Sequence, residues 1–346
     1  MASIPQFNLL PHPPTTDLIS AVKFTPRPSL PLLLCSTWDG DITLYDTSSL
    51  TQLTTVRNGN PVLDLEWDDS GRESFFSDVK GDIKKLDFEN SKYETISLGG
   101  DKNGHTEGVK CLKWMQGRLC SGSWDKSVKM WDIRSSANIG VETIQLDEKV
   151  ISMDSTGYKL VMSCTASTNY IYDVRNVSIP LTRLSSPGER QTRRLKCLPN
   201  GEGFLQSTID SRCCVEFFAD PEKSYAFRCH RHTDENKEFD VSYPVNALTF
   251  HPRYQTLFTG GSDGLIYLWN WEKRKRIKQF ADFNGNSVLA MDSKGDTLVV
   301  ATGDDSYRTR AKIEGYDPKT CLVKPSRIYV REMESNEGKP SVKGRK

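Results

Sequence analysis

The chain carries a pattern that recurs about every 42 residues, and this repetition restricts its possible folds more than any other feature. Each copy consists of a short apolar run, a polar turn and a second apolar run. The residues at the matching position of the turn are Gly40, Gly81, Lys126, Asn169, Ser211, Gly264 and Asp305. Their successive spacings are 41, 45, 43, 42, 53 and 41 residues. Seven units of about 40–45 residues are typical of the blades of a β-propeller.

Further strands are expected on both sides of each pair of runs. An inner strand precedes the pair, as in 62–67, 109–114 and 245–250, and an outer strand follows it, as in 52–56 and 276–280. Helical periodicity is nowhere sustained, so the fold class is all-β. The one long spacing, 53 residues, indicates an insertion between Ala219 and Tyr243.

A ring of blades must be closed, because an open ring leaves sheet edges unpaired. The seventh unit lacks an outer strand, and the apolar segment 6–10 is otherwise unassigned. We therefore expect residues 6–10 to close a seven-bladed propeller that spans residues 1–331. The 346-residue length by itself suggests two domains, but the repeat predicts one ring. Residues 332–346 are polar and are expected to form a disordered tail.

The composition excludes several classes of protein. Lys and Arg number 46 against 45 Asp and Glu, so a general nucleic-acid binder is not expected. No apolar run reaches the roughly 18 residues of a membrane helix, and no secretory signal is visible at the N-terminus. The nine cysteines are scattered and lack a CxxC motif, which favours buried, reduced thiols. The adjacent Cys213 and Cys214 leave a redox or metal site as the lesser alternative.

The third unit has the most complete signature, with Gly-His at 104–105, Ser-Gly-Ser-Trp-Asp at 121–125 and Trp-Asp at 131–132. This pattern resembles the WD-repeat family. In that family such residues form a buried structural network, so the resemblance assigns the network to His105, Ser121, Asp125 and Trp131. Asp263 and Trp269 in the sixth unit repeat the six-residue spacing from Asp125 to Trp131.

Five longer sequence stretches restrict the resemblance to one branch of the WD-repeat family. They are residues 36–46, 207–218, 225–231, 243–252 and 260–270. Over residues 17–330 the chain is similar to the mitotic (spindle assembly) checkpoint WD-repeat proteins of the Bub family and to their close paralogue, the nuclear-pore messenger-RNA export factor. Ser211 stands where the family usually has Gly, and Cys213 and Cys214 replace small aliphatic residues.

The resemblance implies a non-enzymatic, monomeric adaptor without a cofactor. Such a protein binds a short docking motif of the checkpoint kinase and of its kinase-like relative. It recruits them to kinetochores by reading phosphorylated Met-Glu-Leu-Thr repeats on a kinetochore scaffold, which delays anaphase until chromosomes attach. The expected location is the nucleus, and kinetochores in mitosis. The alternatives are a messenger-RNA export factor and an unrelated propeller scaffold such as a ubiquitin-ligase receptor, although ubiquitin-like binding is not expected.

Two tryptophans are candidates for docking-peptide binding. Trp38 and Trp124 each directly precede the turn Asp of their unit, outside the position of the core Trp. Such turns cluster on one face of a propeller, and Trp is enriched among the residues that dominate binding energy at interfaces. The residues alone leave local packing on neighbouring turns equally possible, and the resemblance favours peptide docking.

Arginines in the fifth unit are candidates for phosphothreonine-peptide binding. Arg193, Arg212 and Arg228, with Arg231 nearby, fall on runs that are expected to meet around one groove. Planar guanidinium groups are well suited to phosphate. From the residues alone, pairing with Asp210, Glu216 or Asp220 is the simpler interpretation. The resemblance assigns phosphate reading to Arg212 and Arg228, and less firmly to Arg193.

Two remaining features suggest other chemistry only weakly. The basic run 273–278 fits a nuclear-import signal or an RNA-binding patch, but a solvated turn is the simpler interpretation. His230 and His232 would share a strand face near Cys229, but no fourth metal ligand is evident. No metalloprotease, serine-hydrolase or phosphate-loop motif is present. No catalytic residue and no metal site are therefore assigned.

Overall fold

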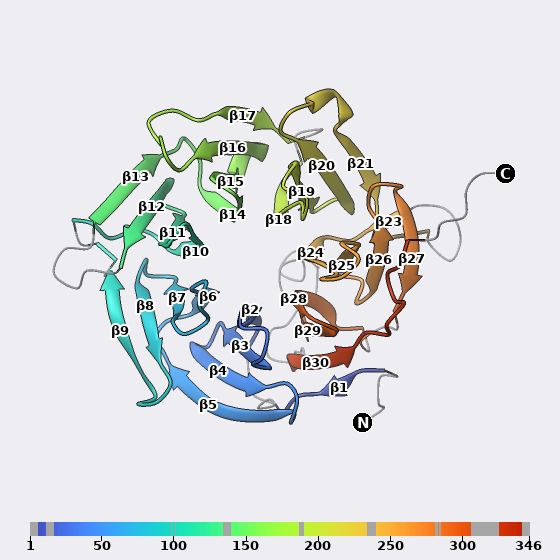
Figure 1. The fold of residues 1–346 in the computed structure, drawn as a ribbon, viewed down its shortest axis with the longest axis horizontal. Helices are drawn as coiled ribbons and strands as arrows, with labels where there is room; N and C mark the ends of the chain where they lie inside the picture. Colours follow the sequence, from blue (N-terminus) through green and yellow to red (C-terminus); the bar gives the residue numbers. More distant parts are fainter. Residues whose placement is uncertain are drawn as a thin grey trace, which may run out of the picture.

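The structure is a computed structural model that describes residues 6–11, 17–97, 99–100, 102–133, 140–186, 190–233, 240–280, 283, 285–305 and 325–340. Four-stranded sheets stand around a central axis as the blades of a ring (Figure 1). The described residues form seven such sheets, and their helical segments are two 3-10 turns, Thr165–Ser167 and Pro221–Lys223. The seven-bladed, all-β prediction is confirmed.

Six blades take their strands in sequence order from the axis outwards. Blade one holds β2 (Ile19–Phe24), β3 (Leu32–Thr37), β4 (Asp41–Asp46) and β5 (Thr51–Arg57), and blade two holds β6 (Val62–Trp67), β7 (Ser74–Asp78), β8 (Ile83–Asp87) and β9 (Lys92–Ser97). Blade three holds β10 (Val109–Met115), β11 (Arg118–Ser123), β12 (Ser127–Asp132) and β13 (Gly140–Gln145), and blade four holds β14 (Val150–Thr156), β15 (Lys159–Cys164), β16 (Thr168–Asp173) and β17 (Thr182–Ser185). Blade five holds β18 (Thr192–Cys197), β19 (Gly203–Thr208), β20 (Arg212–Phe217) and β21 (Tyr225–Arg228), and blade six holds β24 (Val245–Phe250), β25 (Leu257–Gly261), β26 (Ile266–Asn270) and β27 (Lys275–Gln279).

The seventh blade joins the two ends of the chain. It consists of β28 (Ser287–Lys294), β29 (Thr297–Gly303), β30 (Arg327–Glu332) and the N-terminal β1 (Asn8–Leu9). In β1, Asn8 lies opposite Val330 and Leu9 opposite Tyr329. The aromatic ring of Phe7 packs edge-on against that of Phe283, with 5.1 Å between the ring centroids. The N-terminal segment therefore closes the ring, as predicted.

The long spacing between units five and six corresponds to an extra hairpin. Strands β22 (Arg231–Thr233) and β23 (Asp240–Ser242) pair with each other outside the seven blades. The hairpin begins three residues after β21 ends, close to the turn that carries Arg212. The insertion therefore adds a hairpin between blades five and six, and its His232 contacts Asp263 of blade six.

The predicted start of the tail at residue 332 is too early. Met333 is buried, and the turn that follows brings Glu337 back onto Arg331, whose guanidinium donates hydrogen bonds of 2.8 and 2.6 Å to the carboxylate. Both side chains of this ion pair are buried, so each requires the other. The segment that follows β30 therefore packs on blades six and seven, since the Tyr254 hydroxyl of blade six also donates to the backbone oxygen of Ser335. Residues 341–346 lie outside the described residues.

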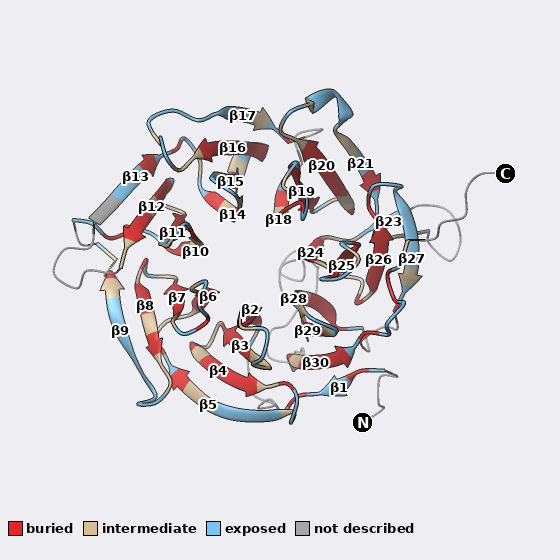
Figure 2. Ribbon diagram, viewed as in Figure 1, coloured by how far each residue is buried: buried red, intermediate tan, exposed pale blue. Residues whose placement is uncertain are grey.

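Burial decreases from the axis to the rim. The inner and middle strands are buried and the outer strands are mostly exposed (Figure 2). Inner strands of neighbouring blades are also joined by hydrogen bonds, because the backbone N–H groups of Leu112, Cys197 and Phe24 donate to Asp64, Asp154 and Asp292 of the preceding blade. These carboxylates satisfy backbone donors that would otherwise face the channel unpaired.

The described cysteines are free and buried. Cys213 and Cys214 alternate across β20, and the sulfur of Cys213 lies 3.6 Å from that of Cys229, which directly follows β21. Burial raises the pKa of the Cys214 thiol to about 12, which keeps it protonated. No group of three or more His, Cys, Asp or Glu residues in the described chain is arranged to hold a metal ion. Nor does this part contain a helix that could span a membrane.

Candidate functional site

Trp38 and Trp124 occupy equivalent places in blades one and three. Each follows the second strand of its blade, and its backbone N–H donates a 2.9 Å hydrogen bond to the residue preceding the inner strand, Leu18 or Gly108. This bond places both indoles beside the start of an inner strand, at the rim of the channel. A Cβ at Gly108 would lie 2.8 Å from the ring of Trp124, so glycine allows the indole to lie flat on the backbone.

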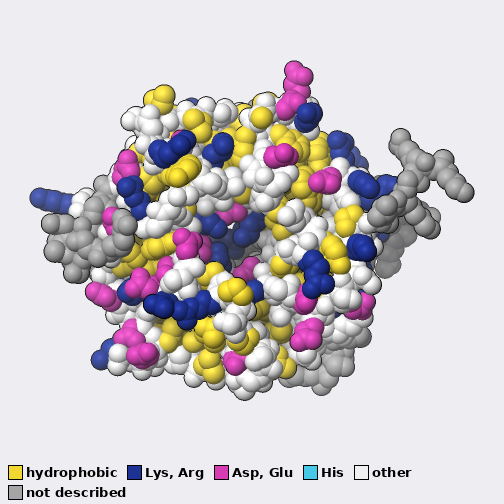
Figure 3. All heavy atoms as spheres, viewed as in Figure 1, with side chains coloured by type: hydrophobic (Ala, Val, Ile, Leu, Met, Phe, Trp, Pro, Cys, Tyr) yellow, Lys and Arg dark blue, Asp and Glu magenta, His cyan; other side chains and the backbone are white. Residues whose placement is uncertain are grey.

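The two tryptophans line one cavity of about 230 Å³, which we call the channel-mouth pocket. Inner strands contribute Lys110 from blade three, which also carries Trp124, and Arg193 and Arg194 from blade five. These three are the charged residues among those that line the pocket, and all are cations. In the face-on view, Lys and Arg side chains surround the central hollow together with some acidic groups (Figure 3).

The pKa of Lys110 reflects both its burial and the cations around it. Burial lowers its pKa, and the nearby Arg194 and Arg193 lower it further, against the opposing effect of Asp64, to about 8. Arg193 donates to the side-chain oxygen of Asn246 at 2.8 and 3.2 Å. An anion entering the pocket would therefore meet three cations and would favour the protonated form of Lys110.

Arg212 and Arg228 meet on the outer strands of blade five. They lie directly opposite each other on β20 and β21, so their side chains share a face of the sheet. Arg212 donates through Nε to Asp210 at 3.0 Å, and Arg190 donates through Nε to the same carboxylate oxygen at 2.5 Å. Arg228 is exposed. We call Arg190, Asp210, Arg212 and Arg228 the arginine corner.

The structure separates the three arginines predicted for one groove. Arg193 lines the channel-mouth pocket with the tryptophans. Arg212 and Arg228 lie together in the same blade, but farther from the propeller axis. Pairing of Arg212 with Asp210, the simpler interpretation of the sequence, does occur. The other acids have different partners, since Asp220 pairs with Lys223. Arg231 pairs with Asp240 of the inserted hairpin.

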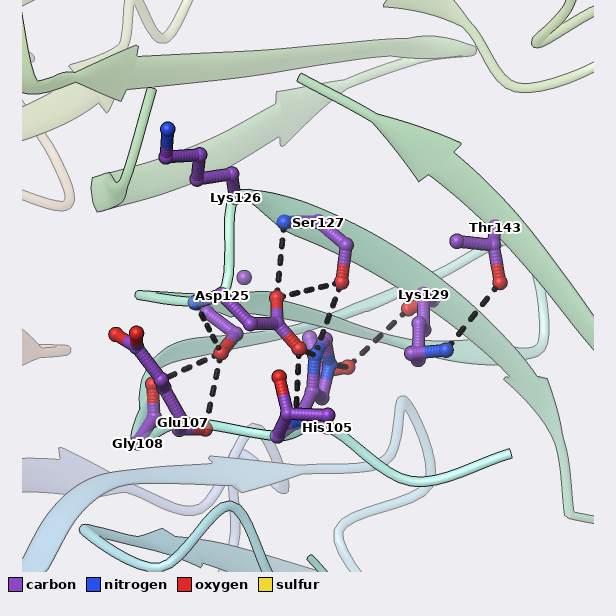
Figure 4. A network of polar contacts seen from close by, with 12 residues as sticks. His105, Glu107, Gly108, Asp125, Lys126, Ser127, Lys129 and Thr143 are labelled. Atoms are coloured by element: carbon purple, nitrogen blue, oxygen red, sulfur yellow. Dashed lines mark hydrogen bonds and ion pairs between the residues drawn. The ribbon is translucent and has the colours of Figure 1, made fainter. Parts of the chain in front are cut away.

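A polar network fixes the turn that carries Trp124 (Figure 4). Burial lowers the pKa of His105 and keeps the imidazole neutral, so Nδ1–H donates to Asp125 at 2.8 Å and Nε2 accepts from the Ser121 hydroxyl at 2.8 Å. Trp131 Nε1 donates to the same hydroxyl oxygen at 2.8 Å. Ser127 donates to the second oxygen of Asp125 at 2.6 Å. The network links the turn, two strands and the preceding loop into one unit.

Blade six contains a second network of the same kind. His230 bonds to Asp263 and to the Thr259 hydroxyl, both at 2.8 Å, and Trp269 Nε1 donates to Thr259 at 3.0 Å. The sequence predicted Asp263 and Trp269 here but not His230, because the inserted hairpin moves this His to 33 residues before its Asp, against 20 in blade three. His232 contacts the other Asp263 oxygen at 3.0 Å. Both histidines are therefore engaged by a carboxylate.

Three residues of the two sites were not predicted: Lys110, Arg194 and Arg190. The first two face the channel from inner strands of different blades. No local motif marks them, although the seven-fold repeat itself places the inner strands around a common axis. Arg190 lies before β18 and reaches the turn of the neighbouring strands through Asp210.

Fold and geometry together define a WD-repeat propeller with two clusters of cationic side chains. The WD domain, G-beta repeat family matches residues 98–132 and 235–270. The chain is 33% identical to the mitotic checkpoint protein BUB3.1 of Arabidopsis thaliana, over 95% of this chain and 94% of that protein. It therefore belongs to the Bub3 family of mitotic checkpoint WD-repeat proteins.

The export-factor paralogues are nearly as similar. The chain is 29% identical to the poly(A)+ RNA export protein of Schizosaccharomyces pombe, over 95% of this chain and 92% of that protein. Among solved structures, the WD40 repeats of RRP9 superpose with a TM-score of 0.74 at 15% identity, covering 94% of this chain and 97% of that one. This last likeness concerns the fold alone.

Proposed function

We propose that this protein is a non-enzymatic adaptor of the spindle assembly checkpoint. The observation that carries the proposal is the channel-mouth pocket, where Trp38 and Trp124 stand beside three cations. Two half-exposed indoles offer apolar contact, and the cations suit an acidic side chain. The ligand is a short docking motif of the checkpoint kinase and of its kinase-like relative.

The arginine corner is the proposed reader of phosphothreonine in Met-Glu-Leu-Thr repeats of a kinetochore scaffold. Arg212 and Arg228 lie opposite each other, so a phosphate placed between them meets two guanidinium groups. Charge-assisted bonds to a phosphate of about −1.5 to −2 charges exceed what an uncharged threonine can form. Arg193 belongs to the docking surface in this proposal, since it lines the pocket.

The two ligands share blade five. Arg193 and Arg194 are on its inner strand, and Arg212 and Arg228 are on its outer strands. A docking peptide that leaves the pocket over this blade would help to form the groove for the phosphopeptide. Each ligand must then strengthen binding of the other by the same factor. In the cell the protein acts in the nucleus and at kinetochores in mitosis, and it delays anaphase by holding the kinase there.

The experiment measures binding of repeat peptides with and without phosphate, in the presence of the docking peptide. The wild-type protein should prefer the phosphopeptide, and the double variant Arg212→Ala, Arg228→Ala should lose that preference. Arg183→Ala on β17 is the matched control, because this arginine is also on an outer strand and pairs with acidic neighbours. A wild-type protein without phosphate preference, or a double variant that retains it, would refute the phosphate-reading function.

The second candidate function is messenger-RNA export at the nuclear pore. The 29% identity to an RNA export protein over nearly the whole chain favours it. The basic run 273–278 is the relevant surface, and its residues 273–277 are exposed. An RNA-binding role predicts salt-dependent binding of single-stranded RNA that weakens when these lysines and arginines are replaced by glutamine. RNA binding with no affinity for the kinase docking motif would favour this alternative.

A further inference from the structure

Residues 333–340, which we call the C-terminal strap, turn back after β30 and are held first at blade seven. The backbone N–H of Met333 donates a 2.6 Å hydrogen bond to the backbone oxygen of Asp296, in the turn between β28 and β29. Glu337 forms a buried ion pair with Arg331, at 2.6 Å. A buried ion pair of this kind is stable only while both partners are in place. The strap is therefore anchored at its start and near its middle.

Blade six supplies the remaining contacts of the strap. The Tyr254 hydroxyl donates to the backbone oxygen of Ser335 at 2.5 Å. Gly338 has a φ of +82°, and a Cβ at this position would lie 2.7 Å from the Thr256 hydroxyl oxygen and 3.0 Å from the ring of His251. The strap therefore lies directly on the loop between β24 and β25, which carries these three blade-six residues.

The imidazole of His251 holds this loop together. Its side chain is buried, and Nδ1 accepts hydrogen bonds from the backbone N–H groups of Arg253 and Tyr254 at 3.1 and 3.4 Å. Because Nδ1 is an acceptor, the neutral ring carries its proton on Nε2. Nε2 is buried and has no hydrogen-bond partner among the described residues. The loop therefore has its shape only while the ring is neutral.

The charges around His251 come from three elements. Burial lowers the pKa of His251, the carboxylates of Glu337 in the strap and Asp296 in blade seven act to raise it, and Arg253 of its own loop lowers it. Both carboxylates are already paired, Glu337 additionally with Lys278 of β27 at 3.5 Å and Asp296 with Arg253 at 3.2 Å. Burial prevails, so the pKa of His251 lies below its ordinary value and the ring is neutral at pH 7.

We propose that His251 is a pH-sensitive lock: protonation of its ring opens the loop between β24 and β25 and releases the C-terminal strap from blade six. The second proton must bind at Nδ1, which then faces two N–H donors and accepts from neither. The loop has to open, and the Tyr254 hydroxyl leaves Ser335. This inference goes beyond the adaptor function and does not depend on it.

The direction of the pH dependence follows from proton binding. The docked strap holds His251 with a lowered pKa, so the docked state binds fewer protons than the released state. Docking is therefore fully stable above the ordinary pKa of histidine and weakens as the pH falls below it.

Release of the strap would affect the seam of the ring. Met333 belongs to the same apolar cluster as Phe7, which directly precedes the closing strand β1. The guanidinium of Arg331 lies 5.7 Å from the ring of Phe7. Without the strap this buried arginine loses the carboxylate of Glu337, beside the segment that closes the propeller. The lock thus links pH to the place where the two ends of the chain meet.

The test follows the methyl signal of Met333 by NMR in the full chain, with carbon-13 in the methionine methyl groups, from about pH 7.5 to 5. Met333 packs among aromatic rings, so its signal shifts when the strap leaves. In the wild-type protein the signal should move as the pH falls from about 6.5 towards 5, while that of the buried Met162 of blade four stays in place. His251→Asn should abolish the transition, because its amide oxygen accepts the same backbone bonds and does not titrate. His232→Asn is the matched control, since this histidine lies on the inserted hairpin and should leave the transition unchanged.

Tyr254→Phe is a second variant, and it leaves His251 intact. It removes only the hydroxyl that holds the strap, so the strap should leave at a pH about half a unit higher. A Met333 signal that does not move in the wild-type protein overturns the proposal. A transition that persists in His251→Asn belongs to a carboxylate and overturns it as well. An unchanged midpoint in Tyr254→Phe, or a Met162 signal that moves together with that of Met333, would show that protonation does not act on the strap and would equally refute the lock.

Discussion

The channel-mouth pocket and the arginine corner hold their positive charges in opposite ways. In the pocket, burial together with the nearby Arg194 and Arg193 lowers the pKa of Lys110 to about 8. In the corner a carboxylate accepts from two of the arginines and fixes their direction. The pocket is therefore a site whose charge is relieved by its ligand, whereas the corner is already ordered before a ligand arrives.

This difference suggests a division of labour between the two surfaces. A pocket with indoles and three neighbouring cations gains affinity from apolar burial and from bringing an anion to those cations. A corner with pre-ordered arginines loses little side-chain entropy on binding and gains specificity for one shape of anion. The pocket should hold the permanent partner and the corner the partner that depends on phosphorylation.

The largest expected effect is on the pocket. Trp38→Ala and Trp124→Ala should each weaken binding of the kinase docking peptide by about 2 kcal/mol or more, roughly 30-fold, because buried tryptophans dominate interfaces. Calorimetric titration would measure this, with unfolding scans to show an intact ring. Tyr158→Ala is the control, since this exposed aromatic lies in the turn between β14 and β15, against Arg175, and not in the pocket. If both tryptophan variants bind the docking peptide with wild-type affinity, the two indoles serve local packing and not peptide binding.

The fold could be read from the sequence because its main signal is repetition. Seven copies of one pattern predict seven blades, and a unit without an outer strand predicts closure by the N-terminal segment. The C-terminal end was harder, because the polar residues Arg331 and Glu337 look solvated in the sequence and form a buried pair only after the chain turns back. Local polarity does not show a contact between residues that meet in this way.

The sites were predictable where they lie on turns and not where they lie on inner strands. Trp38 and Trp124 stand out because they flank the turn Asp of a recognisable unit. Lys110 and Arg194 belong to different blades and meet only across the channel. Similarly, the sequence did not predict His230 as part of a network, because an inserted hairpin separates it from Asp263. Contacts between distant units depend on ring geometry, which a local motif does not encode.

The next largest effect is expected at the arginine corner, where the contribution of Arg228 to phosphopeptide binding can be measured by itself. Arg228→Ala should reduce phosphopeptide affinity by about 1.5 kcal/mol, roughly tenfold, since it removes one charge-assisted hydrogen bond. Docking-peptide affinity measured alone should not change, because Arg228 is not among the residues that line the pocket. Fluorescence anisotropy with labelled peptides can measure both in one series. An equal loss of affinity for the two peptides would mean that both bind to one continuous surface. It would contradict the distinction between the pocket and the corner.

The smallest effect tests the charge of Lys110 in the pocket directly. The pKa of Lys110 is lowered to about 8, so the free protein carries this charge below pH 8 and loses it as the pH rises further. An acidic docking peptide favours the charged form, so its affinity should be constant near pH 7 and fall about fivefold by pH 9.

Lys110→Arg keeps its charge throughout this range and should remove the pH dependence while retaining the affinity found at pH 7. Lys110→Met should be independent of pH and weaker throughout. The phosphopeptide offers an internal comparison, because its proposed contacts are Arg212 and Arg228, which are not among the residues that line the pocket with Lys110. If docking is independent of pH in the wild-type protein, the amine does not meet an anion, and the pocket binds its peptide through the indoles and the two arginines alone.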